Sequence, residues 1–266
     1  MDIKQLMVTA VQAALKAGEE ILKIYHSGDF GVEQKADHSP LTRADKKAHE
    51  VIQELLTPTS YPVLSEEGVD IPYTERIKWP YFWMVDPLDG TKEFVKRNGE
   101  FTVNIALIHK QKAILGIIYV PITRMLYYAA EGIGSYRMEI TSFLNFDLQG
   151  IISQSVKLPL QVEHKRNFTV VASRSHLSEK TQDFISGLKV EHKQVDFLSS
   201  GSSIKLCIIA EGNADVYPRF APTMEWDTAA GQAICEFAGK QVIDYSTNNP
   251  MLYNKPALLN NWFIAS

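Results

Sequence analysis

The sequence predicts a protein that combines an α+β part with an α/β part, and the order of its strand and helix signals carries this prediction. In the first part, strand signals follow one another closely, at 101–109, 113–119 and 124–129. Such close spacing favours antiparallel pairing. The second part opens with a strand at 168–173 and a helix at 179–188, followed by further strand and helix signals, which is typical of a separate α/β unit.

The chain length agrees with two domains. With 266 residues, 45% of them hydrophobic, the chain can bury a large core, and it lies near the size at which chains divide. We expect the boundary within 139–158. The prediction is an N-terminal α+β domain at 1–147 and a C-terminal α/β domain at 148–266.

The first segment has the pattern of an amphipathic core helix. Apolar residues recur at helical spacing from Ile3 to Tyr25, and a second helix is expected at about 44–56. The first segment lacks the apolar run and cleavage site of a signal peptide, and no run approaches the roughly 20 residues that span a bilayer. We therefore expect a cytoplasmic protein without a transmembrane segment, and leave open its oligomeric state and any association with the inner membrane face.

Composition excludes several classes of function. A net charge of -4 gives no global reason to expect binding to a nucleic-acid polymer. Cys207 and Cys235 lie in apolar helical contexts without CxxC spacing, so we expect packed thiols. No HxH or HExxH spacing indicates zinc, and no Walker A or GxGxxG motif indicates a nucleoside-triphosphate or dinucleotide cofactor.

The most informative segment places two carboxylates directly after an apolar strand. Residues 77–85 are rich in aromatic and branched side chains and should be extended, so that Asp86 emerges at a strand end. Pro87 is expected to stop both ladder and helix and to fix a turn. Asp86 and Asp89 could then aim their oxygens into one small volume, as Mg²⁺ requires.

The next residues favour a phosphate at the same place. Gly90 lets the backbone approach an anion, and a short helix beginning near Thr91 would offer free N–H groups. The alternative is that Asp86 and Asp89 are only turn formers, since Asp, Pro and Gly suit any strand-to-helix turn. That alternative loses ground because further acidic groups are suitably embedded, at 65–68 and 225–231.

These motifs resemble the inositol monophosphatase superfamily of lithium-sensitive, magnesium-dependent phosphatases. The superfamily pattern is an acidic pair, then DPxDGT, then WD before a helix of small residues. It occurs here in that order at 66–67, 86–91 and 226–227. Nearly the whole length is also similar to the bacterial 3'(2'),5'-bisphosphate nucleotidase branch, through 86–94, 96–106, 173–176 and 217–220. The resemblance implies a sugar-phosphatase-like layered αβαβα fold with the site between its two domains.

The resemblance implies a metal site for two or three Mg²⁺ ions, in which Asp86 bridges two of them. Water would be the nucleophile, and the base would be a Thr–Asp pair formed by Thr91 and Asp45. Taken alone, Asp45 reads more simply as a cap of the helix at 44–56. The implied metal ligands are Glu66, Asp86, the carbonyl of Leu88, Asp89 and Asp227.

The second half carries the residues that distinguish substrates. The resemblance places an arginine, Arg219, where the inositol phosphatases carry an acid, and a guanidinium is well matched to a second phosphate. Lys205 could add a point charge. Taken singly, Lys205 reads as a solvated helix residue and Arg219 as a surface ion pair. The full set implied to contact substrate is Glu66, Leu88, Asp89, Gly90, Thr91, His176, Ser202, Lys205, Arg219 and Asp227.

The resemblance thus implies a small nucleotide substrate and a definite reaction. We expect Mg²⁺-dependent hydrolysis of adenosine 3',5'-bisphosphate to AMP and phosphate, with the sulfated analogue also accepted, linked to sulfate assimilation. One alternative is an inositol or sugar monophosphatase, which Arg219 argues against. Another is a regulator that binds metal and nucleotide without turnover, which the presence of Asp45, Thr91 and all four acidic ligands argues against.

Overall fold

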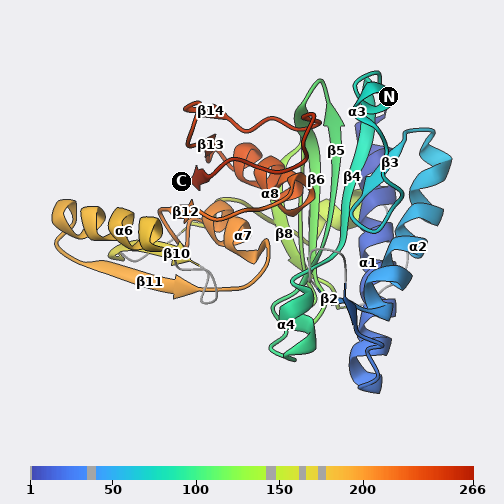
Figure 1. The fold of residues 1–266 in the computed structure, drawn as a ribbon, viewed down its shortest axis with the longest axis horizontal. Helices are drawn as coiled ribbons and strands as arrows, with labels where there is room; N and C mark the ends of the chain where they lie inside the picture. The colour runs from blue at the N-terminus through green and yellow to red at the C-terminus, as the bar shows by residue number, and fades with distance from the viewer. Residues whose placement is uncertain (1, 35–39, 142–147, 162–165, 173–177) are drawn as a thin grey trace.

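The layered arrangement predicted from the sequence is confirmed in the computed structural model, which describes residues 2–34, 40–141, 148–161, 166–172 and 178–266. Helices α1 (Ile3–Ser27) and α2 (Arg43–Leu56) cover one face of a seven-stranded sheet, and α7 (Ile204–Glu211) and α8 (Glu225–Phe237) lie on its other side (Figure 1). The strands of the second half of the chain, β10 to β15, and α6 (Glu179–Glu191) lie beyond α7 and α8. The layers therefore alternate as α, β, α, β, α.

The seven-stranded sheet is antiparallel except at one edge, where β3 and β4 run parallel. Its strands, in spatial order, are β3 (Val63–Ser65), β4 (Tyr81–Asp89), β5 (Thr102–His109), β6 (Lys112–Val120), β7 (Met125–Ala130), β8 (Gly134–Glu139) and β9 (Val156–Lys157). The antiparallel succession expected from 101–129 is confirmed. Sequence reasoning missed β8, which continues the same meander.

The sheet is buried on both faces because helices cover it twice. In β5, Ile105 and Leu107 belong to the core beneath α1 and α2, whereas Ala106 and Ile108 belong to the core beneath α7 and α8. Gly116 in β6 allows α8 to come close, since a Cβ there would lie 2.3 Å from the carbonyl oxygen of Ala230. This close contact fixes the position of α8, whose first turn carries Asp227.

The strand that carries Asp86 differs from the prediction in two ways. It begins at Tyr81, because the residues before it form α3 (Tyr73–Arg76) and a turn rather than an extended segment. It also does not end at Pro87: Asp86 pairs with Asn104, Asp89 pairs with Thr102, and the register shifts between the two pairs. A bulge accommodates a proline that cannot donate to the ladder, so the strand bends here and then resumes.

The second half forms a further β layer. The parallel pair β10 (Phe168–Ala172) and β11 (Val195–Ser199) lies beside a sheet of order β12 (Tyr217–Arg219), β15 (Phe263–Ala265), β13 (Val242–Asp244) and β14 (Asn249–Pro250). A bridge between Val170 and Val216 connects the two sheets. The remaining elements are β1 (Glu33–Gln34), β2 (Pro40–Leu41), the 3-10 turn η1 (Thr57–Thr59), α4 (Thr91–Val95) and α5 (Leu148–Ser153).

The two halves of the chain share one core. β9 lies within 148–266 but pairs with β8, and α8 packs on β5 and β6. The division at 147/148 stays a prediction. Cys207 and Cys235 are both buried and unpaired, which confirms packed thiols. Within the described ranges, no helix is long and apolar enough to cross a membrane.

Candidate active site

Four carboxylates from distant parts of the chain face one another beside the bulge of β4. Asp86 and Asp89 flank the bulge, and Asp227 is the third residue of α8. Glu66 follows β3 directly, and its N–H donates to the carbonyl of Val85 at 3.1 Å, which places it beside β4. Sheet pairing and helix packing together thus bring these four residues close enough for Glu66, Asp89 and Asp227 to act electrostatically on Asp86.

Burial and mutual repulsion dominate the electrostatics of this cluster. Burial raises the pKa of Asp86 well above its ordinary value, and the charges of Glu66, Asp89 and Asp227 raise it further. The pKa of Asp227 is also raised, first by burial and then by Asp89 and Glu66, although Arg219 opposes this shift. A divalent cation would offset both burial and repulsion, because it supplies the positive charge that this cluster lacks.

Each of the three aspartates has one oxygen fixed by the backbone. The N–H of Leu88 donates to Asp86 Oδ1 at 3.1 Å, that of Ser203 to Asp89 Oδ2 at 2.7 Å, and that of Met224 to Asp227 Oδ2 at 2.9 Å. These contacts fix the orientation of each carboxylate, as the outer contacts of metal ligands commonly do.

The donor set fits a hard divalent cation. It consists of carboxylate oxygens, together with the carbonyl of Leu88, which are the ligands that Mg²⁺ prefers. As placed in the described ranges, no three acidic, histidine or cysteine side chains are arranged around a single ion position. The assignment of these five residues as ligands therefore stays a prediction that rests on their proximity, burial and chemistry.

Thr91 and Asp45 meet although 46 residues separate them. Thr91 begins α4, as expected, and its Oγ1 lies 3.1 Å from Asp45 Oδ1 and 3.3 Å from the carbonyl oxygen of Leu88. The other oxygen, Asp45 Oδ2, accepts from the N–H of Thr42 at 2.7 Å, completing a capping box at the start of α2. The two alternatives for Asp45 are thus compatible, because each uses a different oxygen.

Asp45 is also buried, with 1% of its surface exposed. Burial raises its pKa, and the hydrogen bonds from Thr42 and Thr91 oppose that shift. A carboxylate that accepts from a hydroxyl and is shielded from water is suited to act as a base through that hydroxyl.

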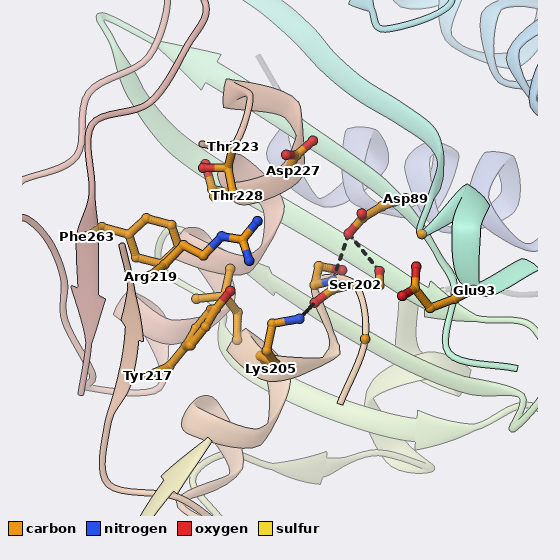
Figure 2. Close-up of a pocket in the computed structure, with 14 residues that line it drawn as sticks. Asp89, Glu93, Ser202, Lys205, Tyr217, Arg219, Thr223, Asp227, Thr228 and Phe263 are labelled. Carbon is orange, nitrogen blue, oxygen red and sulfur yellow. Dashed lines mark hydrogen bonds between the residues drawn. The ribbon is translucent and has the colours of Figure 1, made fainter. Parts of the chain in front are cut away.

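A cavity of about 110 Å³ adjoins the acidic cluster and carries positive charge on its opposite wall. Figure 2 shows the guanidinium of Arg219 extending from β12 into this cavity, toward Asp89 and Asp227. A second opening of about 440 Å³ is also lined by Asp89, Arg219 and Asp227, so the two spaces share these walls. Together they have the size of a small-ligand site.

Arg219 retains hydrogen-bonding capacity at this site. One terminal nitrogen, Nη2, donates to the carbonyl of Pro222 at 3.2 Å. Its Nε is buried and has no hydrogen-bond partner among the described residues. A buried guanidinium N–H without an acceptor is costly, so an anion at this position would be stabilised.

Lys205 is not a solvated helix residue, contrary to the simplest interpretation of its sequence context. Only 4% of its surface is exposed, and its Nζ donates to the carbonyls of Ser202 at 2.6 Å and Ser200 at 3.2 Å. Burial and, less strongly, the charge of Arg219 lower the pKa of Lys205 to about 8, while the charge of Asp89 opposes this shift. The backbone carbonyls of the loop at 200–202 thus hold the ammonium at the cavity wall.

Three other predicted contacts have different outcomes. The hydroxyl of Ser202 donates to Asp89 Oδ2 at 2.6 Å, so it contacts the acidic cluster directly, and its contact with substrate stays a prediction. Gly90 lines both spaces in a left-handed conformation, with φ +91. His176 lies outside the described residues.

Sequence reasoning missed the polar contacts that support Asp89. Asn104 Nδ2 lies 3.4 Å from Asp89 Oδ2, and Asn104 Oδ1 accepts from Thr102 Oγ1 and Ser203 Oγ. Asn104 pairs with Asp86 across the sheet.

The chain belongs to the inositol monophosphatase family, whose sequence model matches residues 2–265. Members of this family generally require a metal ion, Mg²⁺, for activity. The 3'(2'),5'-bisphosphate nucleotidase CysQ of Salmonella typhimurium is 44% identical over 257 residues, which cover 95% of this chain and 96% of that protein. The enzyme of the same name from Escherichia coli is 44% identical over 261 residues, covering 96% and 97%.

Solved structures agree with these relationships. The crystal structure of CysQ from Bacteroides thetaiotaomicron, described as a bacterial member of the inositol monophosphatase family, is 51% identical, with a TM-score of 0.92 and coverage of 100% and 98%. The extragenic suppressor protein suhB from Bartonella henselae is 23% identical, with a TM-score of 0.75 and coverage of 98% and 93%, and shares the fold.

Proposed function

We propose that this protein is a Mg²⁺-dependent 3'(2'),5'-bisphosphate nucleotidase that hydrolyses adenosine 3',5'-bisphosphate to AMP and phosphate. The main supporting observation is that Asp89 and Asp227 of the acidic cluster line one cavity together with Arg219 and Lys205. The names of relatives that are 44% identical along nearly their whole length support the same substrate class.

Five residues would hold two or three Mg²⁺ ions. When bound, the ions would stabilise the negative charge that spreads over the transferring phosphoryl group. The ligands would be Glu66, Asp86, the carbonyl of Leu88, Asp89 and Asp227.

The protein itself would supply orientation and a proton acceptor. Asp45 accepts from Thr91 Oγ1, which leaves the oxygen lone pairs of Thr91 to accept from a water molecule that attacks in line. Because Asp45 Oδ2 is already occupied by the cap of α2, the orientation of Oδ1 toward Thr91 is fixed before substrate binds.

The positive wall would bind the second phosphate. Arg219 extends its terminal guanidinium nitrogens into the cavity (Figure 2), where they could donate to an anion, and Lys205 adds a fixed charge on the same wall. The cavity of about 110 Å³ suits a phosphate group rather than a whole nucleotide, so the nucleoside would extend into the adjoining space of about 440 Å³.

The decisive experiment measures phosphate release from a panel of substrates. The panel contains adenosine 3',5'-bisphosphate, 3'-phosphoadenylyl sulfate, inositol 1-phosphate and fructose 1,6-bisphosphate, with Asp86→Asn as the control for contaminating phosphatase. We expect the highest kcat/KM for the two adenosine compounds. A preference for inositol 1-phosphate would establish a monophosphatase instead, and nucleotide binding without turnover would establish a regulator.

A further inference from the structure

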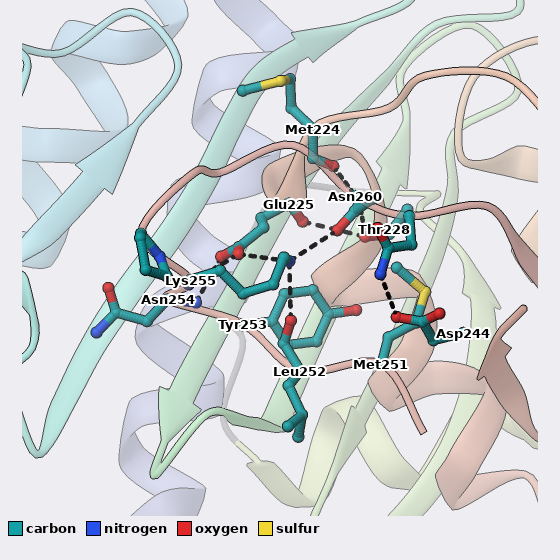
Figure 3. Close-up of polar contacts among 12 residues, drawn as sticks. Met224, Glu225, Thr228, Asp244, Met251, Leu252, Tyr253, Asn254, Lys255 and Asn260 are labelled. Carbon is teal, nitrogen blue, oxygen red and sulfur yellow. Dashed lines mark hydrogen bonds and ion pairs between the residues drawn. The ribbon is translucent and has the colours of Figure 1, made fainter. Parts of the chain in front are cut away.

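A buried polar network lies behind Asp227, outside the cavity that would hold substrate. Its centre is Glu225, the first residue of α8, whose surface is completely buried. Figure 3 shows Glu225 facing the C-terminal segment at Asn254 and Lys255, while Asn260 reaches the first turn of α8 from the other side.

The carboxylate of Glu225 is fully engaged by that segment. Its Oε2 accepts from the N–H of Asn254 at 2.5 Å, and its Oε1 accepts from the N–H of Lys255 at 3.0 Å and from Lys255 Nζ at 2.6 Å. The same ammonium also donates to the carbonyl of Leu252 and to Asn260 Oδ1, so all three of its hydrogens have acceptors. The buried negative charge is therefore compensated within the network.

The segment 254–260 also holds the backbone of the helix start. The N–H of Glu225 donates to the carbonyl of Leu258 at 2.9 Å, and that of Asn260 to the carbonyl of Thr223 at 2.8 Å. The amide of Asn260 donates to the carbonyl of Met224 at 2.7 Å. The N–H of Met224 in turn donates to Asp227 Oδ2. The amide of Asn260 also donates to the hydroxyl of Thr228 at 3.0 Å, so one segment fixes residues on both sides of Asp227.

The other side of the segment is attached to the connection between β3 and β4. Arg76 is 3% exposed and donates to Asn254 Oδ1 at 2.7 Å and to the carbonyls of Lys255 and Pro256. Asn254 returns a bond to the carbonyl of Arg76 at 2.9 Å. This connection begins with Glu66 and leads into the strand that carries Asp86.

We propose that Glu225 is a positioning residue for the metal site. Through the segment 254–260 and Arg76, Glu225 fixes the position of Asp227 relative to Glu66 and Asp86. This inference rests on the proposed function in that it assigns Asp227 to the Mg²⁺ site. Carboxylates repel one another and move apart unless the backbone holds them. A less firmly held start of α8 should therefore lower metal affinity rather than the rate of the chemical step.

The test measures Mg²⁺ binding directly, by calorimetry on the whole protein without substrate, together with kcat at saturating Mg²⁺. Glu225→Gln keeps the side-chain size but presents an amide N–H₂ to donors that need acceptors. We expect Mg²⁺ binding about tenfold to a hundredfold weaker, as for other residues that orient metal ligands, and a much smaller change in kcat. Arg76→Lys should act in the same direction, because an ammonium cannot replace the spread of the guanidinium.

The matched control is Glu211→Gln. Glu211 is also a buried acid, 5% exposed, that accepts from a cation, Arg137, and from the hydroxyl of Tyr127, but at the far end of α7. The Glu211→Gln substitution should lower the melting temperature without weakening Mg²⁺ binding. Unchanged Mg²⁺ affinity in Glu225→Gln, or in Arg76→Lys if the first variant does not fold, overturns the inference, as does an equal loss in Glu211→Gln.

These outcomes are separate from those of the substrate panel. If the wild type binds Mg²⁺ but hydrolyses no adenosine bisphosphate, the proposed substrate is wrong, and the calorimetry still decides the role of Glu225. If the wild type binds no Mg²⁺, both the metal site and the positioning role are refuted.

Discussion

Replacing Arg219 by glutamine tests whether the positive wall of the cavity selects a second phosphate. The side chain has a buried Nε without an acceptor among the described residues, and its Nη2 donates to the carbonyl of Pro222. Glutamine keeps a polar side chain of moderate length but removes the charge. It is preferable to glutamate, because a carboxylate here would add repulsion against Asp227, whose pKa Arg219 now lowers.

The expected magnitude follows from the bond that is lost. A hydrogen bond to a charged group contributes about 1.5 to 3 kcal/mol. Since about 1.4 kcal/mol corresponds to a factor of ten, kcat/KM for adenosine 3',5'-bisphosphate should fall by about tenfold to a hundredfold. Loss of the positive charge should also lower the Mg²⁺ concentration required for every substrate, because Arg219 acts on the acidic cluster and repels a divalent cation bound there.

The assay therefore compares two substrates at saturating Mg²⁺. Adenosine 3',5'-bisphosphate and 3'-AMP carry the same phosphate for hydrolysis, and only the first carries a second one. Arg219→Gln should reduce kcat/KM strongly for the bisphosphate and little for 3'-AMP. Equal losses for the two substrates would show that Arg219 supports the structure or the metals, and that the second phosphate is recognised elsewhere.

Three further predictions concern the acidic cluster, the base and the lysine. Asp86→Asn should abolish turnover in a folded protein. In EDTA, the wild type should gain stability relative to Asp86→Asn as pH falls from neutrality toward the ordinary carboxyl pKa of about 4, because the raised pKa of Asp86 lets the folded state bind a proton before the unfolded state does; thermal unfolding that depends on pH equally in both proteins contradicts this. Thr91→Val should lower kcat by about a hundredfold or more, the usual contribution of a positioned base, while Mg²⁺ binding measured by calorimetry persists; near-normal kcat excludes the Thr91 and Asp45 pair as the base. Because the pKa of Lys205 is lowered to about 8, kcat/KM for the bisphosphate relative to 3'-AMP should decline as pH rises through about 8, and Lys205→Met should remove that decline; a ratio independent of pH in the wild type refutes a charged role for Lys205.

The sequence determined the features that depend on neighbours along the chain. Helical periodicity predicted α1 and α2, close strand spacing predicted the antiparallel meander, and apolar context predicted the buried thiols of Cys207 and Cys235. Motif resemblance also selected the acidic set and the pair of Thr91 and Asp45 before any geometry was known. Local patterns were less successful where a bulge intervened, because Pro87 ends a regular ladder but not a bulged one.

Only the tertiary structure decided how distant polar groups share their bonds. Asp45 divides its two oxygens between the cap of α2 and Thr91, which no local rule predicts. Lys205 is buried because carbonyls of the loop at 200–202 accept its hydrogens, although a lysine in a helix is expected from sequence alone to be solvated. The partners of Glu225 lie 29 and 30 residues away, and those of Arg76 nearly 180 residues away. Periodicity reports which face of an element is apolar, whereas the partner of a buried charge depends on which elements pack together, and that is settled only when the core forms.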